Sequence, residues 1–260
     1  MGPGPAKLWP TVAPQWMLDL PEQLEDLFFN LYKCFVYDNR YEYYIKGLSN
    51  TLLLTFMALL MGIVLGVIVA MVRSTWDKNN SELHGFPKFI LRIANWLCNV
   101  YLTVIRGTPV LVQLMIWYFV VFSHSRDGVA VAAFAFGINS GAYVAEIIRG
   151  GIMAVDAGQM EAGRSLGFGY VSTMRFIIRP QAFKAVLPAL ANEFIVLLKE
   201  TSVAAFVGVA DLTYAGNVVG GASYEYLFPL LLTALMYLVM VMFFTFLVNK
   251  LERRLRNSER

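Results

Sequence analysis

Long runs of this chain contain no Asp, Glu, Lys or Arg, and these runs restrict the possible folds more than any other feature. They cover residues 47–72, 107–125, 128–145 and 226–249. A helix needs roughly 20 mostly apolar residues to cross about 30 Å of hydrocarbon. Because 58% of all residues are hydrophobic and only 15% are charged, an ordinary water-soluble domain is excluded. Each run therefore predicts a membrane-spanning helix.

A fifth span is expected over 184–210, although this segment contains Glu193, Lys199 and Glu200. With five crossings, the loop after the first span, the loop 149–184 and the C-terminal tail fall on one side, and they hold most of the Lys and Arg residues. Basic loops favour the cytoplasmic side. We therefore predict an all-α polytopic membrane protein with five transmembrane helices, an external N-terminus and a cytoplasmic C-terminus.

The sequence divides into three parts. Residues 1–45 are expected to form an extracytoplasmic leader, in which 16–36 mixes apolar and acidic residues and predicts an amphipathic helix on the membrane surface. A poorly ordered leader is the alternative. Residues 46–255 form one transmembrane domain without a linker or an internal repeat, and 256–260 form a cytoplasmic tail.

Small residues recur every fourth position along two of the predicted spans. Such stripes allow helix backbones to approach closely, either within one subunit or between two. The stripes are Ala58, Gly62, Gly66 and Ala70 in the first span and Ala133, Gly137, Gly141 and Ala145 in the third.

Motifs for catalysis and for nucleotide binding are missing from the sequence. There is no GxxxxGK[ST] phosphate loop and no GxSxG nucleophile motif. The two cysteines and the two histidines are expected on opposite sides of the membrane, so neither pair predicts a metal site. We expect no catalytic, cofactor-binding or metal-binding residue and no nucleic-acid partner, so any nucleotide must be bound by another subunit.

A charged segment rich in glycine, 161–180, lies between the third and fourth predicted spans. Asp156 begins a capping box that predicts a short helix, and Gly167 ends it. A second short helix follows, and breaks are expected at Pro180 and Pro188 before the fourth span. Two short helices at an angle would form a knob suited to a groove on another protein.

Together with RGTPVLVQL at 106–114 and LLKETSVA at 197–204, this segment resembles the permease subunits of ATP-binding-cassette importers, specifically the polar amino acid uptake family. Residues 161–180 are similar to the EAA loop of that family. Gly163 stands for the second alanine of the pattern, which weakens the helix by ~1 kcal/mol, and Arg179 stands for a leucine. The residues that match are Glu161, Ala162, Gly163, Gly167, Ile177 and Pro180. The resemblance implies that they couple the chain to a cytoplasmic ATPase subunit. An ordinary amphipathic connector is the alternative.

Ionisable groups inside a span are functional candidates because they are costly in hydrocarbon. Lys199, Glu200 and Thr201 are the first choice for a substrate pathway, and the resemblance supports that role. Glu193 and Asn192 rank lower. The alternative is an ion pair that joins two helices of the fold.

A second group of candidates lies near the ends of the second and third spans. Gly-Thr-Pro is expected to break the helix as the chain enters the bilayer, and the preceding arginine is either an ordinary interface residue or part of a cytoplasmic gate. The candidates for a gate or a helix start are Arg106, Gly107, Thr108, Pro109, Gln113, Glu146 and Arg149.

The resemblance implies a permease that imports a polar amino acid by alternating access across the inner (cytoplasmic) membrane of a bacterium. Its partners would be two ATPase subunits that bind ATP and Mg²⁺, a second copy or a homologous permease, an extracytoplasmic binding protein, the amino acid and membrane lipid. The outer segment 200–226 contains acidic but no basic residues, which favours a cationic amino acid. The rivals are an ion-coupled secondary carrier and a membrane scaffold or enzyme subunit that does not transport.

Overall fold

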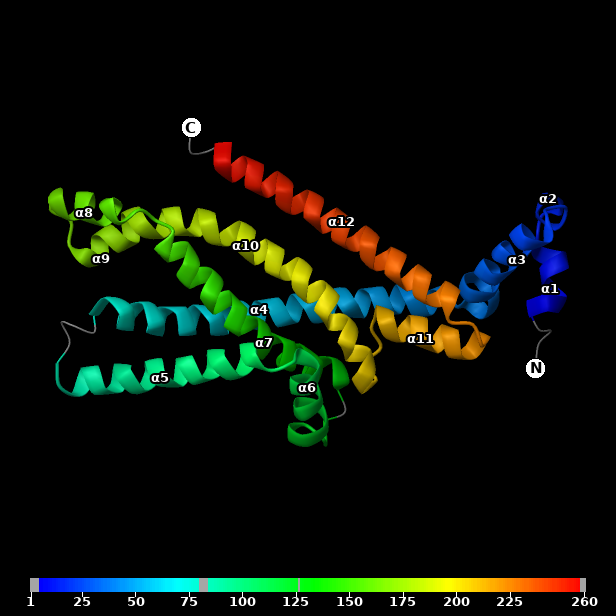
Figure 1. The fold of residues 1–260 in the computed structure, drawn as a ribbon, viewed down its shortest axis with the longest axis horizontal. Helices are drawn as coiled ribbons and strands as arrows, with labels where there is room; N and C mark the ends of the chain where they lie inside the picture. The colour runs from blue at the N-terminus through cyan, green and yellow to red at the C-terminus, as the bar shows by residue number, and fades with distance from the viewer. Residues whose placement is uncertain (1–4, 80–83, 126, 258–260) are drawn as a thin grey trace. The chain divides into compact units, whose positions relative to one another are not determined.

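The computed structural model describes residues 5–79, 84–125 and 127–257, and this part of the chain contains helices and no strand. It includes 5 helical segments that are long and apolar enough to cross a membrane (Figure 1). They are Tyr41–Asp77, Phe86–Gly107, Gly128–Met153, Tyr170–Val207 and Leu227–Leu255. The predicted all-α fold with five spanning helices is thus confirmed.

The position of the second span was wrong. Instead of 107–125, the second long helix is α5 (Phe86–Gly107). The predicted region forms the shorter α6 (Val110–Met115) and a π-helical turn, η3 (Ile116–Val121). The search for uncharged runs missed α5 because this helix carries the basic residues Lys88, Arg92 and Arg106.

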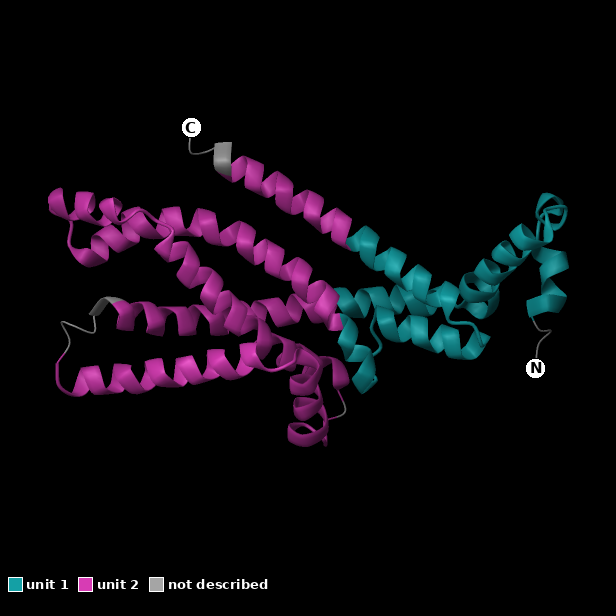
Figure 2. Ribbon diagram, in the orientation of Figure 1, with its two compact units in different colours: residues 1–52, 202–240 teal, residues 53–201, 241–260 magenta. Residues whose placement is uncertain are grey.

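The chain forms two compact units, shown in separate colours in Figure 2. Unit 1 comprises Met1–Leu52 and Ser202–Met240. Its leader is helical rather than irregular, but as several short pieces. The helices of unit 1 are α1 (Pro5–Val12), α2 (Gln15–Leu18), α3 (Glu22–Leu31), η1 (Tyr32–Val36), η2 (Tyr37–Asn39), the first part of α4 (Tyr41–Asn79), most of η5 (Thr201–Val207), α11 (Leu212–Ser223) and the first part of α12 (Leu227–Asn257). Residues 258–260 of the predicted tail lie outside the described residues.

Unit 2 comprises Leu53–Thr201 and Val241–Arg260. Besides α5, α6, η3 and the remainders of α4 and α12, it contains α7 (Gly128–Met153), α8 (Ala157–Ser165), α9 (Tyr170–Thr173), η4 (Met174–Ile178) and α10 (Arg179–Glu200). Helix α7 is the centre of this unit, since 67% of its most apolar stretch is buried and it packs against α5, α6 and α10.

The small-residue stripes of α4 and α7 pack inside the chain. A Cβ atom added at Gly62 would lie 2.9 Å from Ser140 Oγ, and one added at Gly137 would lie 2.9 Å from Met61 Cβ. The two helices approach so closely only because these positions lack side chains. Of the two readings of the stripes, the structure shows packing within one subunit.

The fourth span is continuous with the helix before it, so the expected breaks at Pro180 and Pro188 are wrong. α9, η4, α10 and η5 follow one another without a gap over Tyr170–Val207. Pro180 is the second residue of α10, directly after the π-helical turn η4, and Pro188 lies inside α10, so neither proline interrupts the helix. The irregular element is the π-helical turn η4.

Candidate functional site

The buried polar side chains of unit 2 include a group that joins neighbouring helices: Gln113, Asn139, Ser140 and Glu193. Ser140 Oγ donates a hydrogen bond to Glu193 Oε1 at 2.9 Å, and Asn139 Nδ2 donates to Gln113 Oε1 at 3.0 Å. Because Asn139 and Ser140 are consecutive residues of α7, the two bonds link α6, α7 and α10. Buried polar networks of this kind fix the relative positions of helices when their members are satisfied.

Gln113 also explains how the helix break at 107–109 is stabilised. α5 ends at Gly107, Thr108 is extended, and Pro109 precedes the first turn of α6. The last carbonyls of a helix lack partners within it. Gln113 Nε2 donates to the carbonyl oxygen of Ile105 at 2.7 Å and to Thr108 Oγ1 at 2.7 Å. The expected break is therefore present, and Gln113 holds its two sides together.

Glu146 is the centre of an ionic cluster that joins α4, α5 and α7. Its carboxylate oxygens lie 3.5 Å from Arg73, 4.0 Å from Arg106 and 3.7 Å from Arg149. Arg149 reaches Asp77 as well, at 3.6 Å. Single exposed ion pairs stabilise a fold by only ~0–1 kcal/mol, whereas a network that shares one carboxylate constrains several helices together. Three predicted gate residues, Arg106, Glu146 and Arg149, are thus neighbours.

The predicted pathway residues of α10 do not converge. Glu193 and Thr201 are buried within the chain, and Thr201 Oγ1 donates to the carbonyl of Leu198 at 3.0 Å. Asn192 and Lys199 are exposed, and their spacing of seven residues places them on one helix face. Glu200 is half-buried. In the part of the chain that the structure describes, Lys199 forms no ion pair.

The predicted coupling loop consists of α8 and α9 with η4. Asp156 Oδ1 accepts the N–H of Gly158 at 2.6 Å and caps α8, and Gly167 ends the helix with φ 83°. Gly163 is buried, and a Cβ atom there would lie 2.5 Å from Thr173 Cγ2 and 3.0 Å from Ile177 Cδ1. Gly163 and Ile177 therefore belong to the contact between the short helices. The exposed residues of this segment include Glu161, Ala162, Arg164, Arg175 and Pro180.

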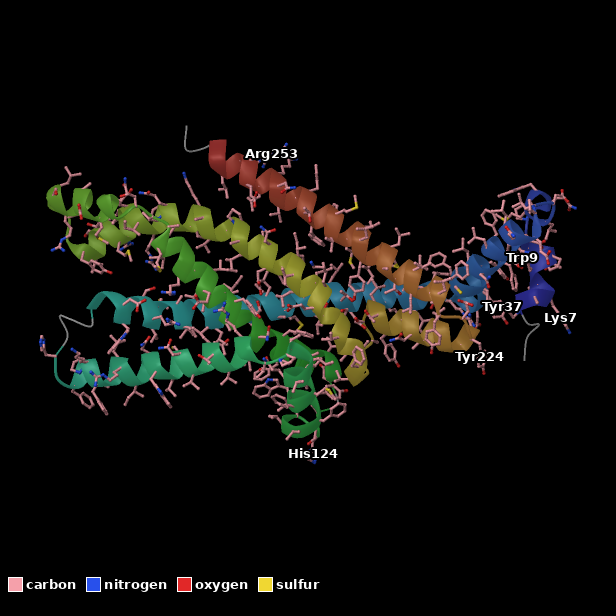
Figure 3. The ribbon with its side chains drawn as sticks, viewed as in Figure 1. Lys7, Trp9, Tyr37, His124, Tyr224 and Arg253 are labelled. Carbon is pink, nitrogen blue, oxygen red and sulfur yellow. The ribbon has the colours of Figure 1, made fainter. Side chains whose placement is uncertain are left out.

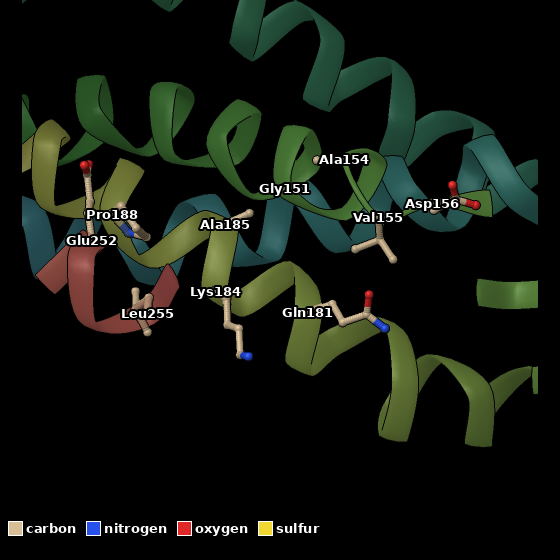
Figure 4. A pocket seen from close by; sticks show the side chains of 10 residues that line it. All are labelled: Gly151, Ala154, Val155, Asp156, Gln181, Lys184, Ala185, Pro188, Glu252 and Leu255. Atoms are coloured by element: carbon tan, nitrogen blue, oxygen red, sulfur yellow. The ribbon is translucent and has the colours of Figure 1, made fainter. Parts of the chain in front are cut away.

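A groove of about 380 Å³ lies beside this loop. The end of α7, the beginning of α8, α10 and the last part of α12 line it, and its polar residues are Asp156, Gln181, Lys184 and Glu252. Figure 4 shows Gln181 and Lys184 projecting from α10, with Asp156 and Glu252 towards opposite ends. The groove therefore lies where α7, α10 and α12 come together beside the start of α8.

Unit 1 contains a buried polar turn that was not predicted from the sequence. Asp211 is fully buried, its Oδ1 accepts the N–H of Tyr214 at 2.8 Å, and Tyr237 donates to its Oδ2 at 3.3 Å. From α4, Asn50 Nδ2 donates to the carbonyl of Ala210 at 2.8 Å. Burial raises the pKa of Asp211 to about 6. An aspartate directly before an apolar helical run was the signal that would have identified this helix cap.

Residues 88–257 match the family model described as binding-protein-dependent transport system inner membrane component. The chain is 36% identical over 218 residues to the arginine transport system permease protein ArtQ of Bacillus subtilis (strain 168), covering 83% of this chain and 93% of that protein. It is 34% identical over 216 residues to the glutamine transport system permease protein GlnP of Escherichia coli (strain K12), with 82% and 92% covered.

Solved structures resemble this fold over most of its length. A crystal structure of an amino acid ABC transporter with histidines superposes with a TM-score of 0.73 at 40% identity, covering 82% of this chain and 94% of that one. An inward-facing structure of the MetNI methionine ABC transporter gives a TM-score of 0.66 over 81% and 95% of the two chains. Its 19% identity shows likeness of fold alone.

Proposed function

Since the chain belongs to the family of binding-protein-dependent transport system inner membrane components, we propose that it forms the translocation path of an ATP-driven amino acid importer. It is a membrane-embedded permease subunit and a transport component rather than an enzyme. Members of this family act with an ATPase and a substrate-binding protein. The rival of an ion-coupled carrier is not favoured, because it leaves the α8–α9 knob without a role.

The single observation that carries the coupling proposal is the packing of this knob. Gly163 brings α8 into close contact with Thr173 and Ile177, and the helix from α9 continues into α10 without a gap. A force on the knob is therefore transmitted to the fourth span without a flexible hinge. ATP and Mg²⁺ are bound by two ATPase subunits that receive Glu161 and its exposed neighbours, since this chain has no phosphate-binding motif.

The pathway proposal rests on the two faces of α10. The buried face places Glu193 beside Ser140, and the exposed face presents Asn192 and Lys199. A second copy or a homologous permease covers the exposed face, so that Lys199 and the half-buried Glu200 meet the substrate between the subunits. Thr201 is buried and supports this end of the helix through its bond to Leu198. The Arg106–Glu146–Arg149 cluster acts as a gate that opens when the helices tilt. The N-terminus lies outside and the C-terminus in the cytoplasm, as the basic loops favour.

The substrate is a polar amino acid delivered by a separate extracytoplasmic binding protein. Two of the relatives are named for arginine and glutamine transport. Residues 200–226 hold Glu200, Asp211 and Glu225 but no Lys or Arg, and an acidic field of this kind attracts a cationic amino acid more than an anionic one.

Reconstitution of the chain with its ATPase and binding protein in proteoliposomes tests this proposal. Amino-acid-stimulated ATP hydrolysis should fall at least about tenfold (~1.4 kcal/mol of coupling) in Glu161→Lys, because the reversed charge faces the docking cleft. Glu22→Lys, which reverses an exposed charge in the leader, is the matched control and should hydrolyse ATP as the wild type does. Uptake driven by an imposed ion gradient, with no ATPase bound, would instead establish the carrier.

A further inference from the structure

Unit 1 contains an apolar pocket of about 480 Å³ that the proposed transport cycle does not use. One side is formed by the leader, including Trp9, Phe28 and Leu31, and the other by Phe228 and Leu232 of α12. Trp9 is labelled in Figure 3, where it lies on the first leader helix. The volume is within the roughly 300–1,000 Å³ range of ligand sites in proteins.

The polar groups around this pocket mostly hold the leader together. Trp9 Nε1 donates to Glu25 at 3.3 Å, and the Trp9 ring packs against Tyr32 at 5.3 Å between centroids. Arg40, 8% exposed, donates to the carbonyl oxygens of Lys33 at 2.9 Å and Ala222 at 3.4 Å. The wall is thus preformed, and its lining is suited to an apolar ligand rather than a polar one.

The pocket is continuous with a surface that faces lipid. Phe228 and Leu232 belong to the spanning segment Leu227–Leu255, and Leu231 and Leu235 on the same helix are exposed, with relative accessibilities of 56% and 55%. A chain that leaves the bilayer along this face reaches the pocket without crossing water.

The leader itself has the character of an interfacial segment. Trp16, Leu24 and Leu27 are exposed beside the acidic residues of α3. Helices with an exposed apolar face and a charged face lie in the boundary between headgroups and acyl chains. The pocket is therefore at the depth where the acyl chains of a phospholipid begin.

We propose that this pocket binds one acyl chain of a membrane phospholipid, which fixes the leader to α12. The inference depends on the place of the chain in the membrane and not on its transport activity, so failure of the importer proposal would leave it standing.

Tryptophan quenching in the purified full chain tests the site. Two single-tryptophan proteins are made by replacing the other four tryptophans with Phe, one keeping Trp9 and one keeping Trp16. Each is titrated in detergent with phosphatidylglycerol carrying brominated acyl chains, which quench indole on contact. Trp9 is 7% exposed and Trp16 57%. Trp9 should therefore be quenched in a saturable step at a lipid-to-detergent ratio about tenfold lower than Trp16 (~1.4 kcal/mol).

Two further variants change the pocket, one by filling it and one by making its wall polar. Ala13→Phe fills it and Leu232→Asn makes its wall polar, and both should remove the saturable step at Trp9 while leaving the quenching of Trp16 unchanged. Size-exclusion chromatography identifies a variant that fails to fold. If one variant fails, the quenching of Trp9 in the other variant tests the proposal. Identical titration curves for Trp9 and Trp16 would overturn the proposal. So would a Trp9 that stays unquenched while the protein forms concentration-dependent oligomers, since a second chain would then occupy the pocket.

Discussion

At the scale of single residues, Asp211 combines a burial penalty with a structural role. Its carboxylate caps α11 and accepts a bond from Tyr237, yet burial raises its pKa from 3.8 to about 6. The folded protein thus binds this proton more tightly than the unfolded chain does. Ionisation therefore destabilises the fold by ~3 kcal/mol above about pH 6, and the penalty disappears as the pH falls towards the unfolded value.

Asp211→Asn should raise the melting temperature at pH 7.5, and the gain should shrink at pH 4.5. Asparagine caps helices as well as aspartate and still accepts the Tyr214 N–H, but it carries no charge that burial penalises. Thermal unfolding of the purified chain, followed by intrinsic fluorescence at the two pH values, measures the difference. A lower melting temperature at both values would show instead that the negative charge itself holds the turn.

For single residues, the sequence predicted which motifs are present but not why each residue type is needed. The glycine of the EAA-like loop was interpreted as a weak point in a helix, whereas the structure shows a close contact of Gly163 with Thr173. Helix propensity is a local property of the chain. The neighbour that excludes a side chain lies ten residues further on, and only the fold brings it into contact.

At the scale of helices, the contact between α8 and α9 predicts an unusual substitution effect. Gly163→Ala restores the family pattern and gains ~1 kcal/mol of helix propensity, but the new methyl meets Thr173 Cγ2, and Thr173 is fully buried and cannot move aside. Overpacking of this kind destabilises by ~1–3 kcal/mol. We therefore expect Gly163→Ala to lower the amino-acid-stimulated ATPase activity of the reconstituted complex.

The second substitution Thr173→Ser should restore that activity. Serine removes the obstructing methyl and keeps the hydroxyl that donates to the carbonyl of Gly169 at 3.1 Å. Activity of the two single variants and of the double variant forms a complete cycle. Additive effects in this cycle would contradict a direct contact between the two positions.

Charge-free runs predicted three of the five long helices, α4, α7 and α12, because a charge inside hydrocarbon is costly. α5 was not predicted because it contains basic residues and so forms no charge-free run. These residues lie near its ends, and the rest of the helix is apolar and largely exposed. A break was expected at Pro180 in the continuous segment Tyr170–Val207 because a proline that a helix accommodates and a proline that ends a helix look the same in sequence. The structure decides between the two cases, because it shows that the helix continues through Pro180.

At the scale of the whole molecule, Lys199 is the residue that most supports the proposal of a second permease beside α10. Its ammonium lies in the fourth span, exposed, and the described residues offer it no ion pair. A lysine inside a span is costly in hydrocarbon, and the cost is highest, ~2.5–3.5 kcal/mol on insertion scales, at the centre of the span. A residue kept despite such a penalty is expected to serve the assembled transporter.

Lys199→Met should therefore raise the melting temperature of the isolated chain by a few degrees and still reduce amino acid uptake by the reconstituted complex about tenfold, since the lost contact is worth ~1.4 kcal/mol. Lys46→Met is the control, because Lys46 is exposed and forms only a 3.9 Å pair with Glu42. It should change neither quantity. A Lys199→Met chain that is less stable than the wild type would mean that the lysine serves the fold through an internal ion pair.

The sequence predicted the number of spans and which segments carry the candidate site residues. The structure adds the direction in which the side chains of these residues point. Glu193 turns inward and Lys199 outward, and this depends on the rotation of α10 against α7. No local pattern specifies that rotation. It follows from close contacts such as that of Gly151 with Val186.

The π-helical turn η4 has a consequence for the orientation of the knob. A π turn contains one residue more than an α-helical turn requires, and η4 joins the knob to the fourth span. Losing that residue would rotate the preceding part of the knob by about 100° relative to α10. Deletion of one residue in η4 should therefore reorient the surface that we propose to dock on the ATPase, without changing the sequence of either short helix.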